Sequence, residues 1–553
     1  MDAQRLCPSG LTWQTYIFLT LLTLACLVPF SRKAYHIDDP LFVWAAQHIA
    51  KHPLNPYGFS ATWYYSPMPM SQITKNPPLA AYYSAAIGAA TGWSEQALHV
   101  AFIPLAVLVI WGTYFLARRL TGHPVVAAAA TLLTPGFLVS STNVMCDTMM
   151  LAFWIWAVIL WIEGLHRRNQ ALLGASGVLI ALCALTKYFG VALIPLLLLY
   201  SIARQRKWRP TILYLLIPTI VLAGYQYWTH ALYQQGLVSA AAIYSIKFHS
   251  AHSLGTLFTG LSFAGGCVLP AISFIPMLWS RRAIFRGCIT TLAAGLCCAV
   301  GGIIGPSEVA RQSWNIVSLQ FGFFAAGGIC ILSLVFSDWW KNRDADSLLL
   351  ALWALGTFLF ATLFNWTVSG RSLLPLIPVA GILLARRLDQ RGIFAGRAVA
   401  VRVALPLALT GIVSLWVTAA DAKLADSARR AAEYIRTNSG VTPADLTFQG
   451  HWGFQYYMQT FGFRPTDFAK FDIKQSPEIV IPENNTNINR VKAEWVESKK
   501  TVAFDADAGV STMNRAMGAG FYSDVWGPLP YAFGRASGEN YVFLKLGLPA
   551  ARN

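Results

Sequence analysis

The chain has 553 residues, of which 55% are hydrophobic and only 12% carry a charged side chain. Soluble domains carry charges on about a quarter of their residues, so this composition excludes an ordinary soluble protein and indicates a polytopic membrane protein. The net charge of +17 does not indicate a nucleic-acid partner, because the basic residues lie between apolar segments, where they set membrane orientation.

Thirteen apolar segments are predicted to cross the membrane, some of them as short or broken helices. In chain order they cover residues 11–30, 97–117, 123–141, 147–164, 171–186, 188–202, 210–229, 254–278, 285–305, 314–336, 347–364, 372–386 and 398–418. Eighteen basic residues lie in one set of alternating loops, against four in the opposite short loops. The positive-inside rule therefore predicts a cytoplasmic N-terminus and an outer C-terminus.

The segment between the first two predicted spans, residues 31–96, is long and rich in Pro, Tyr and Trp. It begins with an acidic pair, Asp38-Asp39, directly after a spanning segment. Adjacent carboxylates raise each other's pKa and burial near lipid raises it further, so such a pair needs partners or a function. Residues 41–50 are predicted to form an amphipathic helix on the membrane surface.

The composition changes after residue 420. Residues 421–553 have an ordinary charge density and no apolar segment that could span a membrane, so we expect a membrane module over 1–420 and a small extracytoplasmic α/β domain over 421–553. A helix is predicted at 426–436, and strands at 478–481 and 541–546. The nine cysteines form no disulfide pattern, which together with the compact tail favours a bacterial inner membrane.

The predicted topology places several uncommon polar residues on the outer face. They are Asp38, Asp39, Lys75, Asp147, Lys187, His249, His252 and Arg371. Each has an ordinary interpretation as well: carboxylates are favourable at helix starts, cations extend from short loops to the interface, and loop histidines usually bind nothing. Their joint position on one face favours a site for an anionic, lipid-linked substrate.

Short motifs also carry a resemblance to a known family. They are the acidic pair, Thr74-Lys75-Asn76-Pro77-Pro78 followed by Tyr82-Tyr83, Asp147 opening a span, Thr186-Lys187-Tyr188-Phe189-Gly190, and Arg371-Ser372-Leu373-Leu374-Pro375. Over residues 10–390 the chain resembles polyprenyl-phosphate-sugar glycosyltransferases of the GT-C type (glycosyltransferase family 39-like). The nearest groups are the dolichyl-phosphate-mannose–protein mannosyltransferases and the bacterial aminoarabinose lipid A transferase.

The resemblance implies a GT-C fold of about thirteen transmembrane helices and a function as a membrane glycosyltransferase. The donor would be a polyprenyl-phosphate sugar, and the acceptor a glycolipid, a glycan or a protein. Because phosphate is a good leaving group, one carboxylate base suffices for inverting transfer. Asp38 is the predicted base, and Asp39 or Asp147 would orient it, raise its pKa or share a divalent cation.

Substrate contacts follow from the same resemblance. Lys75, Lys187 and Arg371 would bind the phosphate, and Tyr65 and Tyr82 of the aromatic first segment would contact the sugar.

A divalent metal ion is a possible cofactor, and the candidate ligands are Asp147, His249 and His252. Thr74 stands where some relatives carry a metal-binding Glu.

Two alternatives from other classes remain. A secondary transporter or lipid-linked sugar flippase needs charged groups near the middle of the membrane and often shows repeat symmetry, and neither is evident in the sequence. A membrane scaffold that only presents the tail domain is the second alternative.

Overall fold

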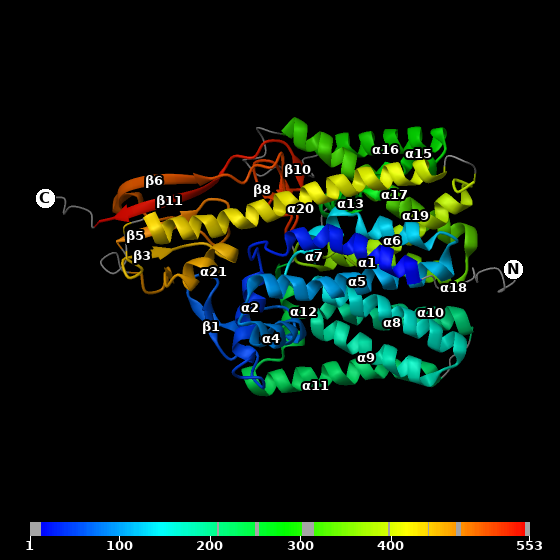
Figure 1. Cartoon of the computed structure of the whole chain (residues 1–553), viewed down its shortest axis with the longest axis horizontal. Coiled ribbons are helices and arrows are strands. Elements are labelled where there is room, and N and C mark those ends of the chain that lie inside the picture. Colours follow the sequence, from blue (N-terminus) through cyan, green and yellow to red (C-terminus); the bar gives the residue numbers. More distant parts are fainter. Residues whose placement is uncertain are drawn as a thin grey trace.

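The helices of the membrane module lie side by side in an elongated bundle, with a β-sheet beyond one end (Figure 1). The computed structural model describes residues 13–206, 210–248, 254–300, 314–395, 399–438, 440, 442–471 and 477–547. The bundle helices are α1 (Trp13–Leu27), α5 (Glu95–Leu120), α6 (Pro124–Leu132), α7 (Pro135–Ser141), α8 (Asp147–Arg167), α9 (Gln170–Thr186), α10 (Leu193–Gln205), α11 (Leu216–Tyr233), α12 (Leu237–Phe248), α13 (Leu254–Cys267), α14 (Pro270–Ser273), α15 (Ile275–Leu278), α16 (Arg281–Val300), α17 (Trp314–Asn342), α18 (Ala345–Leu359), α19 (Leu376–Gln390) and α20 (Val399–Asn438).

Every predicted span overlaps one or more of these helices, and the chain crosses the membrane several times. Within the described residues, eight helices are individually long and apolar enough to cross, or nine if the bent pair α6 and α7 forms one span. The predicted count of thirteen is therefore not confirmed. Proline explains part of the difference: α6 and α7 meet at 62° where Pro135 begins the second helix, because proline cannot continue the hydrogen-bond ladder.

Short helical turns complete several of the spans. They are the 3₁₀ turns η1 (Val28–Phe30), η2 (Tyr188–Ala192) and η3 (Pro210–Leu215), and the π-helical turn η5 (Phe360–Phe364). The turns η2 and η5 each lead out of a span at the edge of the cavity described below.

The first outer segment folds into small elements at the end of the bundle that faces the sheet (Figure 1). These elements are α2 (Asp39–Ile49), β1 (Ser60–Thr62), β2 (Pro67–Pro69), α3 (Met70–Ile73) and α4 (Leu79–Thr91). The helix predicted at 41–50 is present as α2, which packs against α4 and against α21 of the tail. Its apolar face, including Phe42, Val43 and Ala46, is buried.

The last bundle helix continues without a break into the tail. Helix α20 has 40 residues, so the predicted span 398–418 and the predicted helix 426–436 are one element, and the expected domain boundary at 420/421 falls inside it. No glycine lies between Gly411 and its end, and its one internal proline, Pro406, precedes the junction. Strong helix formers therefore carry the helix from the bundle to the sheet.

The tail contains a five-stranded mixed sheet in the order β4-β3-β5-β11-β6. Its elements are β3 (Leu446–Phe448), α21 (Trp452–Thr460), β4 (Arg464–Pro465), β5 (Glu478–Pro482), η6 (Ala493–Trp495), β6 (Val496–Phe504) and β11 (Glu539–Leu546). The strands predicted at 478–481 and 541–546 are β5 and β11, which pair antiparallel with Val542 opposite Ile481. Short strands β7 (Val510–Ser511), β8 (Met513–Asn514), β9 (Ala519–Gly520) and β10 (Ala532–Phe533) cover the end of the bundle.

The tail shares its hydrophobic core with the membrane module. One buried cluster contains Tyr35 of the first segment, Phe102 of α5, Ile435 of α20 and Phe454 of α21. At Gly453, a Cβ atom would lie 1.9 Å from the carbonyl oxygen of Tyr35, so only glycine permits this approach. The start of α21 is therefore seated directly on the first segment.

Candidate active site

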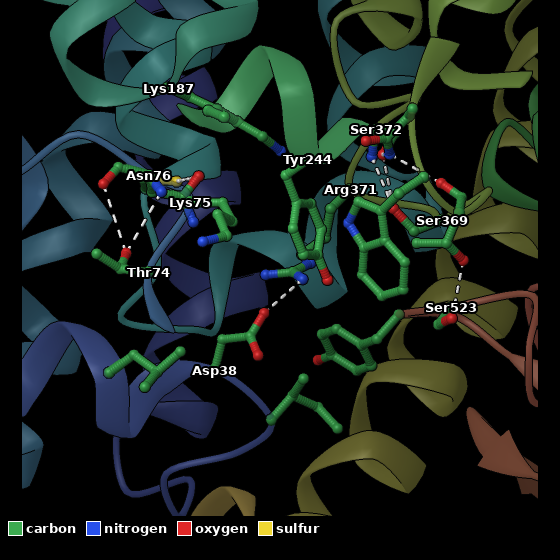
Figure 2. A pocket seen from close by; sticks show the side chains of 18 of the residues that line it. Asp38, Thr74, Lys75, Asn76, Lys187, Tyr244, Ser369, Arg371, Ser372 and Ser523 are labelled. Atoms are coloured by element: carbon green, nitrogen blue, oxygen red, sulfur yellow. Dashed lines mark hydrogen bonds and ion pairs between the residues drawn. The ribbon is translucent and has the colours of Figure 1, made fainter. Parts of the chain in front are cut away.

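A cavity of about 640 Å³ lies where the first segment, the bundle and the tail meet. Its wall includes Asp38, Lys75, Asp147, Lys187 and Arg371, the charged residues predicted from the sequence. Figure 2 shows Lys75, Tyr244 and Arg371 converging on the space around Asp38. A cavity of this size is typical of small-molecule sites.

Asp38 is aimed into this cavity by an unusual backbone conformation. The preceding residue, Ile37, has φ 46°, which is a strained conformation for a β-branched residue. Asp38 occupies the N-cap position of α2, yet its carboxylate makes no capping bond. Oδ2 instead accepts a hydrogen bond of 2.8 Å from the guanidinium of Arg371. Capping therefore does not account for Asp38.

Asp147 and Lys187 are brought together by a helical hairpin. Helices α8 and α9 pack along their lengths and are joined by a short turn at Arg168 and Asn169, so the start of α8 lies beside the end of α9. Lys187 Nζ lies 2.6 Å from Asp147 Oδ1. The Asp147 side chain is only 2% exposed, so its charge needs this partner.

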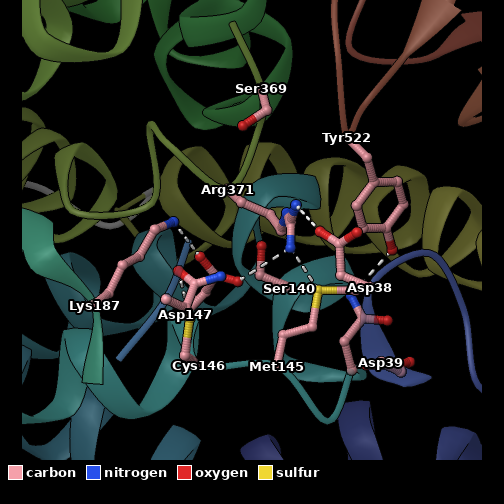
Figure 3. A network of polar contacts seen from close by, with 12 residues as sticks. Asp38, Asp39, Ser140, Met145, Cys146, Asp147, Lys187, Ser369, Arg371 and Tyr522 are labelled. Atoms are coloured by element: carbon pink, nitrogen blue, oxygen red, sulfur yellow. Dashed lines mark hydrogen bonds and ion pairs between the residues drawn. The ribbon is translucent and has the colours of Figure 1, made fainter. Parts of the chain in front are cut away.

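Arg371 connects the two carboxylates (Figure 3). One of its terminal nitrogens is bonded to Asp38, and the other lies 3.7 Å from Asp147 Oδ2. The guanidinium also lies 5.5 Å from the ring centre of Tyr522, a tail residue. Residues far apart in the sequence thus form one charged network. Within it, Lys187 contacts one carboxylate oxygen of Asp147 and Arg371 lies near the other.

Asp39 has a different environment from its neighbour. It is completely buried, and its two carboxylate oxygens accept hydrogen bonds of 2.8 Å from the backbone N–H groups of His36 and Val144. Burial raises the pKa of Asp39 to about 7, and the Asp38 charge adds to this rise, while Lys33 and the two backbone bonds oppose it. Asp39 therefore ties the first segment to the loop that leads into Asp147.

Lys75 lines the cavity and makes no ion pair with another described residue. Its ammonium lies 5.0 Å from the ring centre of Tyr244 and donates to the carbonyl oxygen of Gln72. Partial burial lowers the pKa of Lys75. The ammonium of Lys75, placed in this way in the cavity wall, favours the binding of a negatively charged ligand.

Other predicted site residues lie elsewhere. The ring of Tyr65 packs on Phe468, and the hydroxyl of Tyr82 donates to the carbonyl oxygen of Pro53; neither residue lines the cavity. His249 and His252 lie outside the described residues. Tyr57 and Tyr64 are the tyrosines of the first outer segment that line the wall, and Tyr244 of α12 lines it as well.

The described residues do not by themselves form a complete site for a divalent metal ion. No group of three or more His, Cys, Asp or Glu side chains gathers in this part of the chain as metal ligands would. Of the three predicted ligands, Asp147 is bonded to Lys187, and the two histidines lie outside the described residues. The carboxylates of Asp147 and Asp38 are thus already paired with the side chains of Lys187 and Arg371.

The tail contributes a wall of the cavity that the sequence did not predict. It consists of His451, Trp452, Thr486, Asn487, Met513, Tyr522, Ser523, Val525 and Trp526. Aromatic, amide and hydroxyl side chains of this kind are ordinary in a soluble domain, and only the fold brings them to the charged residues. The shift from membrane-like to soluble composition was the sole signal for this region.

A pair of backbone hydrogen bonds attaches the tail to the loop that carries Arg371. The N–H of Gly370 donates to the carbonyl oxygen of Phe521, and the N–H of Asp524 donates to that of Val368. The Asp524 carboxylate also accepts from the Val368 N–H and the Thr367 hydroxyl. Both backbone groups and a side chain of the tail therefore hold the loop that carries Arg371.

Comparison with known proteins adds independent evidence. Residues 75–228 match the family model described as dolichyl-phosphate-mannose-protein mannosyltransferase. The chain is also 25% identical over 326 residues to an undecaprenyl phosphate-alpha-4-amino-4-deoxy-L-arabinose arabinosyl transferase of Pseudomonas fluorescens (strain Pf0-1). That match covers 57% of this chain and 49% of the relative, so the chain spans about half the length of this curated relative.

Solved structures show a shared fold. The oligosaccharyltransferase of Archaeoglobus fulgidus, crystallised with Zn and sulfate, matches with a TM-score of 0.52 at 15% identity, over 85% of this chain and 68% of that one. The same archaeal enzyme in complex with an inhibitory peptide and a dolichol-phosphate matches with a TM-score of 0.51 at 15% identity, over 85% and 69% of the two chains. The motifs and these matches together confirm the resemblance to the GT-C superfamily of polyprenyl-phosphate sugar transferases, and the chain has the fold of that superfamily.

Proposed function

We propose that this protein is a membrane glycosyltransferase that moves a sugar from a polyprenyl-phosphate donor to a hydroxyl or phosphate of an acceptor. The observation that carries the proposal is the single cavity in which Asp38 lies among Lys75, Lys187 and Arg371. The relatives reported above bear the names of transferases, which supports transfer over the alternatives of a transporter, a flippase or a scaffold.

The charge of the cavity suits the proposed donor. Three cations face two carboxylates, Asp38 and Asp147, which leaves one net positive charge. A sugar linked to a polyprenyl phosphate is a phosphodiester with one negative charge, so the bound donor neutralises the cavity. Charge-assisted hydrogen bonds from Arg and Lys to phosphate oxygens then hold it in place.

In the proposed reaction, Asp38 acts as the general base. It removes the proton from the acceptor hydroxyl as the oxygen attacks the anomeric carbon of the donor sugar from the face opposite the phosphate. The bond between that carbon and the phosphate oxygen breaks, and the polyprenyl phosphate leaves with the electron pair. The new glycosidic bond has the inverted configuration.

Arg371 links donor binding to the base. In the structure its guanidinium donates a hydrogen bond to Asp38 Oδ2. A donor phosphate competes for the same guanidinium, so its binding releases Asp38 for the acceptor. Lys75, Lys187 and Arg371 then stabilise the charge that develops on the leaving phosphate.

The remaining predicted groups have supporting roles. Asp39 positions the base through its two backbone bonds, and Asp147 orients Lys187 and Arg371. The protein is proposed to lie in a bacterial inner membrane with a cytoplasmic N-terminus and an extracytoplasmic tail, so that transfer takes place on the outer face. A glycolipid, a glycan or a protein is the acceptor in this proposal.

The test uses Asp38→Asn in cells that lack the native gene. We expect mass spectrometry of envelope glycolipids and glycoproteins to show loss of one glycan modification in this variant, because removing a general base lowers rates by about 10²–10⁴-fold. The purified variant should still bind undecaprenyl phosphate, whereas Arg371→Ala should not.

Asp467→Asn is the matched control, because Asp467 is a half-buried tail residue outside the cavity wall, and it should leave the modification intact. Survival of the modification in Asp38→Asn would exclude this base. Movement of a lipid-linked sugar across proteoliposomes without transfer would support the transport alternative instead.

A further inference from the structure

The cavity has a charged half and a neutral half. All five charged residues of its wall, the two carboxylates and three cations described above, come from the membrane module. Over the tail residues that the structure describes, the wall includes no Asp, Glu, Lys or Arg. Burial lowers the pKa of His451 to about 3, so its imidazole is uncharged at neutral pH. Tyr522, beside Arg371, marks the boundary between the halves.

The neutral half is built with backbone strain. Among the described residues, eight other than glycine have a positive φ, and five of them follow the ends of helices, where this conformation is common. The other three are Ile37, Trp452 (φ 64°) and Asn487 (φ 53°), and all three line this cavity. Strained residues gather where a fold holds side chains for a ligand, so Trp452 and Asn487 call for a function.

The aromatic side chains of this half are held rigidly. The ring of Trp63 stacks on His451 with centroids 4.6 Å apart, and Trp452 packs against Trp526 at 5.5 Å. The indole N–H of Trp526 donates to Asn484, whose amide in turn donates to Glu539. The amide of Asn487 faces the His451 ring at 3.3 Å. These contacts fix the orientation of the aromatic rings and of the polar groups before a ligand binds.

We propose that this neutral half is the acceptor subsite and that it binds an uncharged saccharide. This inference rests on the proposed transferase function. A sugar ring has an apolar C–H face that packs on indole rings and a rim of hydroxyls that bond with amide and hydroxyl groups, which Trp452, Trp526, Asn487 and Ser523 supply. A sugar hydroxyl held there is the nucleophile for Asp38.

The wall disfavours the other acceptor classes. A phosphorylated glycolipid headgroup needs cations in the wall at the acceptor side, and the described tail residues of the wall include none. The guanidinium of Arg515 lies behind this wall, stacked on Trp526 at 4.1 Å from the ring centre. An extended peptide is commonly bound by main-chain pairing with a free strand edge. Met513, the only strand residue that the tail places in the wall, belongs to β8, which is already paired with β9.

The experiment measures ligand binding to the full-length protein in detergent by saturation-transfer NMR. The neutral probes are maltose, lactose, N,N′-diacetylchitobiose and methyl α-mannobioside, and the charged probe is a 1,4′-bisphosphorylated glucosamine disaccharide. We expect at least one neutral probe to receive saturation at its ring protons. Its affinity should fall at least tenfold in Trp526→Ala and in Asn487→Gly.

Asn487→Gly is included because it removes the amide while glycine tolerates the positive φ, so the variant keeps the fold even if Trp526→Ala does not. Trp495→Ala, the same substitution in the same domain but away from the cavity wall, is the control and should bind the sugar normally. Binding of undecaprenyl phosphate is measured on the same preparations and should persist in all three variants.

The inference is overturned if the bisphosphorylated disaccharide binds more tightly than every neutral probe. It is also overturned if a Ser/Thr-containing peptide receives saturation and no neutral probe does. Sugar binding that is unchanged in both wall variants would overturn it as well. If undecaprenyl phosphate binds and no neutral sugar does, the acceptor assignment alone fails. If undecaprenyl phosphate does not bind, the proposed transferase function fails.

Discussion

Neighbouring residues of identical chemistry have separate tasks in this protein. Asp38 and Asp39 differ by one position, yet the first faces a cavity and the second is fully buried. The strained backbone at Ile37 and the start of α2 turn the two side chains in different directions. One carboxylate is thus available for chemistry, while the other stabilises the loop that presents it.

The buried carboxyl of Asp39 predicts a pH dependence of stability. Its pKa is raised to about 7 in the folded state from about 3.8 in the unfolded chain, so the folded protein binds the proton more tightly. This stabilisation is complete below about pH 4 and is lost as the pH rises to about 7, with a slope of up to about 1.4 kcal/mol per pH unit. Thermal unfolding of the purified protein between pH 4 and pH 8 measures it.

The comparison variant is Asp39→Asn, which cannot titrate. It is less stable than the wild type at pH 4, because an amide offers one acceptor oxygen to the two N–H groups of His36 and Val144. The difference should shrink as the pH rises to about 7 and stay constant above it. A difference that stays constant from about pH 5 to pH 8 would show that Asp39 is ionised in the folded protein throughout.

At the scale of elements, hydropathy predicted the positions of the helices well, because spanning segments must be long and apolar. It did not predict the 62° bend between α6 and α7 or the continuity of α20 across the expected domain boundary. The bend depends on packing around Pro135. The continuity of α20 depends on residues that favour helix on both sides of position 420. Hydropathy falls at that position, so the pattern indicates a domain boundary although the helix continues.

The candidate site, like the helices, contains some residues that the sequence predicted and others that only tertiary packing reveals. Asp147 and Lys187 could be identified from sequence, because the topology places them on the outer face together with other charged residues, in a chain with few charges. The resemblance and the aromatic composition of the first segment predict sugar contacts for Tyr65 and Tyr82, but neither residue lines the cavity. Tyr522 could not be found, because its approach to Arg371 depends on tertiary contacts across 151 positions of the sequence.

The attachment of the tail to the Arg371 loop gives a prediction at this scale. Asp524→Ala removes the carboxylate that accepts from the Val368 N–H and the Thr367 hydroxyl. Hydrogen bonds to a charged group contribute about 1.5–3 kcal/mol, so the loop should open more often. We expect faster amide hydrogen exchange over residues 367–372 and about tenfold weaker binding of undecaprenyl phosphate.

Asp505→Ala is the matched control, because Asp505 lies on the surface of the same domain and pairs only with exposed groups. It should change neither measurement. Unaltered exchange over the loop in Asp524→Ala would mean that the two backbone bonds to Phe521 and Val368 are sufficient to hold Arg371.

At the scale of the whole molecule, one buried ion pair joins the parts. Lys33 and Asp421 are both fully buried and lie 2.6 Å apart. Lys33 also donates to Asn143 and Thr142, in the loop before α8. The first outer segment, the loop before α8 and helix α20 therefore meet at this pair.

The tail completes the network from the other side. The carboxylate of Asp421 accepts from the hydroxyls of Thr512 and Tyr522. Every donor of the ammonium and both carboxylate oxygens are thus satisfied. Because Tyr522 also faces Arg371, the network connects the packing of the tail to the charged half of the cavity.

Asp421→Asn tests whether this network holds the module and the tail together. It leaves the Lys33 charge buried without an opposite charge, and removing one partner of a buried pair costs about 3–5 kcal/mol. We expect a lower unfolding temperature and earlier proteolysis within residues 440–547 than in the wild type. Asp505→Asn, which breaks an exposed pair with Lys423, should change stability by less than about 1 kcal/mol.

The double variant Lys33→Met/Asp421→Asn separates charge from packing. It removes both buried charges, while the amide at position 421 still accepts from Thr512 or Tyr522. Recovery of most of the lost stability would assign the cost to the uncompensated charge of Lys33, as the burial of both side chains leads us to expect. Failure to recover would instead assign it to the hydrogen bonds of Thr512 and Tyr522, and the tail would then be held by those bonds rather than by the ion pair.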